Sequence, residues 1–167
     1  MTDERCPECG FEYDLDQAVA ADVAIVAAIA EVVGLLTSLH DEDARARPDP
    51  QTWSPLEYAC HLRDVFLVQR ERVLLARRVD EPDLVPMGRD ERAVHDGYDE
   101  QDPEIVARQL TDAALMFANV LARLDDATWD RTVIYNYPAP TARSLRWVAV
   151  HTEHEARHHL ADIRRQL

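Results

Sequence analysis

Residues 150–159 read Val-His-Thr-Glu-His-Glu-Ala-Arg-His-His, and they lie in the last long amphipathic segment of a 167-residue chain. His154 and His158 are four residues apart, so on an α-helix their imidazoles stand on one face, about one turn apart. Neutral imidazole is the commonest protein ligand for zinc-like ions. The stretch therefore predicts a C-terminal helix that supplies two ligands of a histidine metal site.

Three other segments have the apolar spacing of amphipathic helices. We expect helices at about 16–39, 55–78 and 103–124, and a last helix from Thr141 or Ser144 to about Arg165. The second has the clearest start, because Ser54-Pro55-Leu56-Glu57 combines a cap, a proline at the first helical position and the glutamate of a capping box. Four long helices without an alternating strand pattern predict an all-α four-helix bundle.

The remaining segments are assigned as connections. Residues 79–102 contain several prolines and glycines and would form a long crossover between the second and third helices, where packing is favoured over a binding role. Residues 132–137 are β-branched and aromatic, yet no partner strand is evident, so we expect a loop. The expected core-facing stripe of the first helix comprises Val19, Val23, Val26, Ile29, Val33 and Leu36.

The composition restricts the partners and the compartment. The chain has 18 lysine and arginine residues against 32 aspartate and glutamate residues, a formal charge of −14, which disfavours nucleic acid and anionic membranes as partners. The most apolar stretch, residues 18–39, is interrupted by Asp22 and Glu31, and we expect no membrane span. The sequence starts without a signal pattern, and three cysteines do not suit a disulfide scaffold. We therefore expect a cytoplasmic protein.

A short N-terminal segment, residues 1–14, precedes the predicted bundle at 15–167 and contains Cys6-Pro7-Glu8-Cys9-Gly10. This spacing is typical of a zinc knuckle, in which two thiolates hold one ion above a tight glycine turn. Cys6 and Cys9 are only half of a tetrahedral site. The candidates for the remaining ligands are a carboxylate, a second chain, His40, His95 or His151. The alternative is a ribbon remnant or a disordered tag without metal.

Residues 154–158 also match His-Glu-x-x-His, the motif of zinc proteases. A protease would need a third ligand, usually downstream, and a strand edge for its peptide, and neither is evident. A carboxylate-bridged di-iron bundle would need Glu-x-x-His on two helices, but only Glu155 and His158 have that spacing. A mononuclear site remains, with His61 of the second helix as its third ligand and open positions for water or substrate.

Three motifs of the chain, in this order, resemble the DinB-like superfamily. They are Trp53-Ser54-Pro55-Leu56-Glu57, His61-Leu62-x-Asp64, and His154-x-x-x-His158-His159-Leu160-Ala161-x-Ile163. The resemblance covers about residues 19–167 and implies a helical bundle in which His61, His154 and His158 bind one divalent metal. The C-terminal motif looks like that of the thiol-transferase branch, which uses bacillithiol or mycothiol. The chain departs from the nearest members at Asp162, where another histidine is frequent.

The resemblance implies a metal-dependent thiol S-transferase of detoxification. A divalent ion, zinc or nickel, would bind a low-molecular-weight thiol as thiolate and present it to an electrophilic substrate, because a coordinating cation deprotonates a thiol whose ordinary pKa is about 8.5. Glu155 is a candidate proton acceptor, although on a helix it points about 100° away from His154, which favours an orienting or solvent-facing role. Asp64 is a candidate partner of an imidazole N–H or one half of a surface salt bridge.

Two other functions fit the same residues. One is a metal-dependent hydrolase that uses bound hydroxide at this site. The other is a non-catalytic metal-binding stress protein that dimerises through its bundle. Members of the family often pair as homodimers, so the resemblance adds a homodimer to the expectations.

Overall fold

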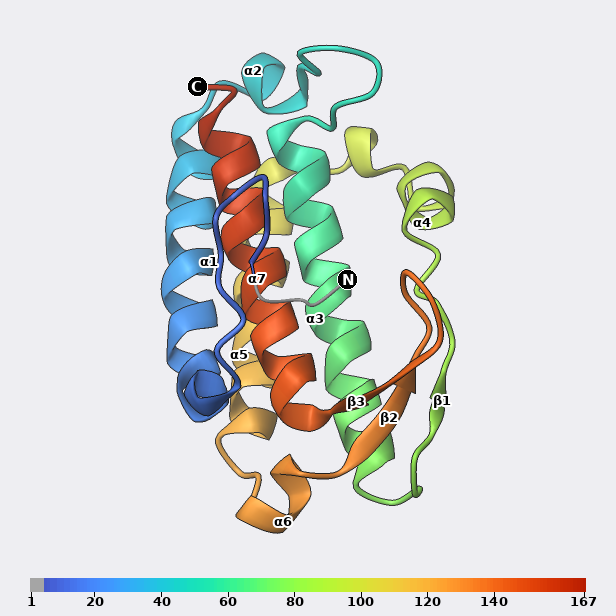
Figure 1. Ribbon diagram of the computed structural model, residues 1–167. Helices are drawn as coiled ribbons and strands as arrows, with labels where there is room; N and C mark the ends of the chain where they lie inside the picture. Colours follow the sequence, from blue (N-terminus) through green and yellow to red (C-terminus); the bar gives the residue numbers. More distant parts are fainter. Residues whose placement is uncertain (1–4) are drawn as a thin grey trace.

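The computed structural model describes residues 5–167, and four long helices form its core (Figure 1). These helices are α1 (Ala21–Ser38), α3 (Pro55–Ala76), α5 (Pro103–Leu121) and α7 (Leu145–Arg164). Both α1 and α3 pack on α5 and on α7, so α7 lies between α1 and α3. The predicted four-helix bundle is confirmed. Residues 1–4 of the predicted N-terminal segment lie outside the described part of the chain.

A 3-10 turn, η1 (Leu15–Ala20), leads into α1. The buried residues of α1 are Ala21, Ile25, Ala28, Ile29, Val32 and Leu36. The stripe predicted for the first helix is wrong at its start, because Val19 and Val23 are 58% and 71% exposed. Val19 lies in η1, whose tighter turn of about three residues breaks the spacing of an α-helix. Val23 lies in α1 itself, on the side away from the buried residues Ala21 and Ile25.

The helical stretch Leu15–Ser38 is long and apolar enough to cross a membrane, with a mean hydropathy of 2.3, although the sequence led us to expect no such span. In the fold this stretch is a bundle helix whose inner face contacts α5 and α7. The core helices of soluble proteins pass the same test of length and composition. Length and composition alone therefore do not make Leu15–Ser38 a membrane span.

Helix α3 begins where the sequence predicts. The Ser54 hydroxyl accepts a hydrogen bond from the Glu57 N–H at 3.3 Å, and the Glu57 carboxylate accepts one from the Ser54 N–H at 2.9 Å. Arg47 donates to both carboxylate oxygens of Glu57, which balances the charge of this buried group. The cap fixes the first turn of α3 and so places His61 in the second turn.

The crossover after α3 contains β1 (Asp83–Leu84), α4 (Arg89–His95) and η2 (Tyr98–Glu100). In Figure 1, α3 and α5 run in the same direction, so the crossover returns the chain to the end of the bundle where α3 begins. Asp64 of α3 holds it there, because its carboxylate accepts hydrogen bonds from the Tyr98 hydroxyl at 2.7 Å and from Arg92 at 3.3 Å. Asp64 thus anchors the crossover and does not orient a site imidazole.

The prediction of a loop at residues 132–137 is wrong, because β2 (Thr132–Tyr135) pairs with two other strands. It lies antiparallel to β3 (Thr141–Ser144) and parallel to β1. The partner β3 falls in the segment that the sequence assigned to the last helix, and the partner β1 falls in the crossover. Helix α7 consequently begins at Leu145, and its cap is the Ser144 hydroxyl, which accepts from the Trp147 N–H at 3.2 Å. Two short helices complete the connections, α2 (Asp41–Arg45) and α6 (Asp126–Trp129).

Candidate metal centre

Helix α7 presents different side chains to the core, to α3 and to the N-terminal segment. Its core face includes Ala156, Leu160 and Ile163. Successive residues of an α-helix are turned by about 100°, so Glu155 and His159 flank the core face. By the same geometry His154 and His158 point away from the core. Helix α3 lies beside the flank that carries Glu155 and His159.

His61 of α3 meets Glu155 and His159 across this flank, and we call these three residues the ligand cluster. The Nε2 atoms of His61 and His159 lie 3.7 Å and 3.6 Å from Glu155 Oε2, and the centres of the two imidazole rings are 5.1 Å apart. One ligand atom of each residue lies within 4.8 Å of the other two. The side chain of His61 is 3% exposed and that of Glu155 is 24% exposed, so the cluster is accessible from its carboxylate side.

Neighbouring side chains fix both imidazoles. The ring of Trp53 lies 5.2 Å from that of His61, and the ring of Tyr58 stacks 5.0 Å from that of His159. Asp162 Oδ2 lies 2.8 Å from His159 Nδ1, on the far side of the ring from the cluster. A carboxylate that accepts the second N–H of a metal-binding histidine is a recurrent feature of metal sites, because it fixes the tautomer and the ring orientation. Asp162 therefore orients His159 toward the cluster.

Burial and nearby charges act in opposite directions on these groups. Burial would raise the pKa of Glu155, but the imidazoles of His159 and His61 hold it well below its ordinary value. Burial would lower the pKa of His159, but Asp162 and Glu155 raise it to about 9, whereas burial lowers the pKa of His61. At neutral pH the metal-free cluster thus holds a carboxylate between one charged and one neutral imidazole, and a cation must displace the proton of His159.

The donor set fits a divalent cation. His61 is buried, and its Nε2 lies 3.7 Å from Glu155 Oε2, which is longer than a good hydrogen bond. Bonds of about 2.0–2.2 Å at tetrahedral angles would place ligand atoms roughly 3.4 Å apart, near the distances of 3.6 Å and 3.7 Å found here. Two imidazoles and one carboxylate are also the ligands of several catalytic zinc sites, in which a fourth position stays open.

The structure divides the predicted ligands His61, His154 and His158 between two places. His61 joins the ligand cluster, whereas His154 and His158 gather with Cys6 and Cys9 of the N-terminal segment. The predicted triad assumed that the face of the last helix with His154 meets the second helix. The face that meets the second helix instead carries Glu155 and His159, each one residue further along the chain.

The sequence therefore did not predict that His159 lies beside His61, and it gave Glu155 only as a proton acceptor, an orienting group or a solvent-facing residue. A usable signal was present in the apolar residues of the last helix. Because Ala156, Leu160 and Ile163 mark the core, the residues that can meet a neighbouring helix are those beside this stripe, not those opposite it.

Of the other candidate ligands, only His151 lies beside the two clusters of α7. His151 stands near His154 and Glu155, His40 occupies the cap position of α2, and His95 ends α4. Cys60, which the sequence did not suggest as a ligand, directly precedes His61 and is buried, and burial raises the pKa of its thiol to about 12. Cys60 thus remains a protonated core residue at neutral pH.

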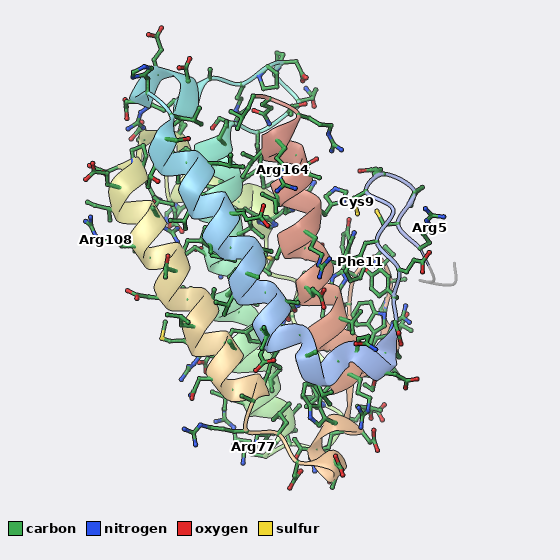
Figure 2. The ribbon with its side chains drawn as sticks, turned by 90° about the vertical axis from the view of Figure 1, so that its left-hand side faces the viewer. Arg5, Cys9, Phe11, Arg77, Arg108 and Arg164 are labelled. Carbon is green, nitrogen blue, oxygen red and sulfur yellow. The ribbon has the colours of Figure 1, made fainter. Side chains whose placement is uncertain are left out.

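A groove of about 610 Å³ lies between the N-terminal segment, α1 and α7, and Phe11, Ala28 and Leu160 line it. Figure 2, seen from the side of α1, shows the N-terminal segment standing beside α7 with Phe11 close to the helix. The ligand cluster lies on the other flank of α7, against α3. The groove is therefore not the approach to the ligand cluster.

Comparisons with known proteins agree with this fold. The family model of the DinB superfamily matches residues 24–163. A solved structure described as "YfiT from Bacillus subtilis is a probable metal-dependent hydrolase with an unusual four-helix bundle topology" is similar, with a TM-score of 0.81 at 16% sequence identity, over 90% of this chain and 86% of that chain. A search of curated proteins finds no match. Because the family model spans nearly the whole bundle, including the ligand cluster, the chain belongs to the DinB superfamily.

Proposed function

We propose that the protein is a metal-dependent enzyme in which His61, Glu155 and His159 bind one divalent cation, zinc or nickel. The observation that carries the proposal is the convergence of these three side chains between α3 and α7. Three protein ligands leave at least one position of the cation open, as in catalytic sites. When bound, the cation would take up a low-molecular-weight thiol of the mycothiol or bacillithiol type as its thiolate.

In this proposal the nucleophile is a thiol from outside the chain. Cys60 is buried and protonated, and Cys6 and Cys9 belong to the other cluster of α7. An external thiol fits this arrangement, because it supplies the sulfur that the cluster itself lacks. The thiol would attack an electrophilic small molecule, and its carbon–sulfur bond would form as the leaving group departs.

The residues of the cluster divide the remaining tasks. Glu155 Oε2 faces the two ligand imidazoles, whereas Oε1 lies 3.9 Å from His151. Because the pKa of Glu155 is lowered, its carboxylate is a weak base, and the proton of the thiol would go to water. Asp162 keeps His159 oriented, and the rings of Trp53 and Tyr58 cover the imidazoles and limit access of water.

A metal-dependent hydrolase is the second candidate. Two imidazoles and a carboxylate are a ligand set of zinc hydrolases, and YfiT, which shares this fold, is described as a probable metal-dependent hydrolase. The two candidates differ in their need for a thiol, because a hydrolase attacks with water.

The test is an assay of the zinc- or nickel-loaded protein with the model electrophile monochlorobimane, with and without mycothiol, bacillithiol or cysteine. We expect thiol-dependent consumption that is lost in His159→Ala and kept in His95→Ala, which removes a histidine from α4. Hydrolysis of ester or amide substrates without thiol would favour the hydrolase instead. A metal-loaded protein with neither activity would be the non-catalytic metal-binding stress protein.

Further expectations accompany this proposal. The partners would be a small thiol and an electrophile, not nucleic acid or a membrane, in agreement with the formal charge of −14. A cytoplasmic location would supply such thiols in reduced form. A homodimer stays a prediction, which light scattering of the purified protein tests.

A further inference from the structure

The N-terminal segment forms a small hairpin, residues 5–12, which we call the N-terminal hairpin. Its ends pair between Arg5 and Glu12, the Cys6 N–H donates to Phe11 O at 2.8 Å, and the Gly10 N–H donates to Cys6 O at 2.9 Å. Gly10 has a φ of +74°, which residues with a Cβ rarely adopt. The tight turn brings the thiols of Cys6 and Cys9 together.

His154 of α7 offers one ring nitrogen toward these thiols. Its Nδ1 lies 2.8 Å from the Tyr13 hydroxyl, and the same hydroxyl lies 3.0 Å from His151 Nδ1. In one tautomer His154 donates its Nδ1–H to the Tyr13 hydroxyl, and that hydroxyl donates its own proton to His151 Nδ1. The Nε2 atom of His154 then carries a lone pair that is available to a metal. That Nε2 atom is buried and has no hydrogen-bond partner within the described residues.

His158 completes the arrangement one helical turn later. Its Nδ1 lies 3.7 Å from Cys6 Sγ, and its Nε2 lies 3.4 Å from a carboxylate oxygen of Glu8 and 3.6 Å from one of Asp162. The nitrogen turned toward the thiol can therefore carry a lone pair, while the other can carry the proton and face carboxylates. This is the pattern expected of a metal-binding histidine.

We propose that Cys6, Cys9, His154 and His158 bind a zinc ion of their own, which fastens the N-terminal hairpin to α7. One ligand atom from each residue lies within 4.8 Å of the other three. A tetrahedral zinc ion with bonds of about 2.3 Å to sulfur and about 2.0 Å to nitrogen separates these ligand atoms by roughly 3.6 Å, and the Cys6–His158 distance is 3.7 Å. Two thiolates and two imidazoles select zinc over harder ions.

The hairpin needs such a fastening because it is too short to bury a core of its own. Its other contacts with α7 are modest: the ring of Phe11 lies 5.3 Å from that of His154, and the guanidinium of Arg157 lies 5.9 Å from the Phe11 ring. Small elements of this size commonly depend on a structural metal for their fold. Figure 2 shows Cys9 at the bend of the hairpin, beside α7.

The zinc site is separate from the ligand cluster, although both use α7. Their ligands interleave along the helix, with His154 and His158 on the outer face and Glu155 and His159 on the flank toward α3. Asp162 lies beside both His158 and His159, but the two sets of ligands share no member, so substitutions of the ligands themselves distinguish the sites. The zinc site can thus be tested whether or not the proposed enzyme activity exists.

Cobalt(II) reports directly on the ligands, because thiolate ligands give a sulfur-to-metal charge-transfer band that imidazoles and carboxylates do not. The test is cobalt titration of the wild-type chain, of the Cys6→Ser/Cys9→Ser double variant, and of Cys60→Ala as a control that removes a thiol from the core. We expect the band in the wild type and in Cys60→Ala, and its complete loss in the double variant. Zinc analysis should show one equivalent fewer in the double variant, while His61→Ala keeps the band.

Hydrogen exchange gives a second readout that does not depend on colour. Zinc should protect the amides of Cys6 and Gly10, which donate within the hairpin, and the double variant should lose that protection while α3 keeps its own. Far-UV circular dichroism verifies that the double variant retains its bundle. A wild-type cobalt complex without a thiolate band, or a double variant with an unchanged zinc content, would overturn the proposal.

Discussion

At the scale of the residue, one position along α7 decides which side chains meet α3. Glu155 and His159 follow His154 and His158 by a single residue, and that step turns a side chain by about 100°. The sequence shows two pairs of residues four apart, but spacing alone cannot say which pair faces which neighbour. The resolving information is the core stripe of α7 together with the N-terminal hairpin, which covers the outward pair.

Two alanine variants separate these pairs. In His159→Ala the ligand cluster loses an imidazole, so we expect the loss of about one metal equivalent while the thiolate band of cobalt remains. In His158→Ala we expect the thiolate band to be lost with its metal equivalent while the ligand cluster keeps its ion, because His158 lies beside Cys6. Metal analysis with cobalt spectroscopy measures both; identical losses in the two variants would mean that they share one ion.

Asp162 should act on metal affinity without touching the metal. Its carboxylate lies 2.8 Å from His159 Nδ1, and loss of such a partner typically weakens metal binding by about 10- to 100-fold. We expect a decrease of this size in Asp162→Asn, measured by chelator competition in the Cys6→Ser/Cys9→Ser background so that only the ligand cluster contributes. Asp112→Asn, on the exposed face of α5, is the control, and equal affinities in both variants would exclude an orienting role.

At the scale of the element, local signals predicted the bundle helices well where a cap marks the start. The Ser54–Glu57 capping box predicts the first residue of α3, and therefore the position of His61 along the helix. The strands could not be predicted in the same way. β2 is short, and its partners lie in the crossover and in a segment that continues into α7, so no local pattern identifies the pairing.

The capping box should contribute measurably to stability. Ser54→Ala removes the acceptor of the Glu57 N–H, and the loss of such a cap costs about 1 kcal/mol of the free energy of unfolding. Urea denaturation monitored by circular dichroism measures it. Ser38→Ala, at the exposed end of α1, is the matched control and should change the free energy of unfolding much less. If both variants were equally stable, Ser54 would not be an effective cap.

Glu57 should make the fold sensitive to acid. Burial would raise its pKa, but hydrogen bonds with Arg47 and Ser54 outweigh burial and lower it. A carboxyl whose folded-state pKa is lowered stabilises the fold above its unfolded pKa of about 4.3, and this contribution disappears as the pH falls through the folded-state value. Glu57→Gln should therefore be less stable than the wild type at neutral pH, with a smaller difference in acid. A constant difference across the acid range would contradict this linkage.

At the scale of the whole molecule, the bundle brings residues far apart in the chain to one helix. Helix α7 lies between α1 and α3, receives His61 from one side and carries the N-terminal hairpin on its outer face. The family resemblance predicted the bundle, and it named His61, which the structure brings together with Glu155 and His159. It could not predict the attachment of the hairpin, because Cys6 and Cys9 lie outside the part of the chain that the resemblance covers.

The most direct test of the ligand cluster is anomalous diffraction at the metal absorption edge from crystals of the metal-loaded protein. We predict a peak bounded by His61 Nε2, Glu155 Oε2 and His159 Nε2, apart from any peak beneath the N-terminal hairpin. A peak shared by His61, His154 and His158, or the absence of any peak between α3 and α7, would contradict it.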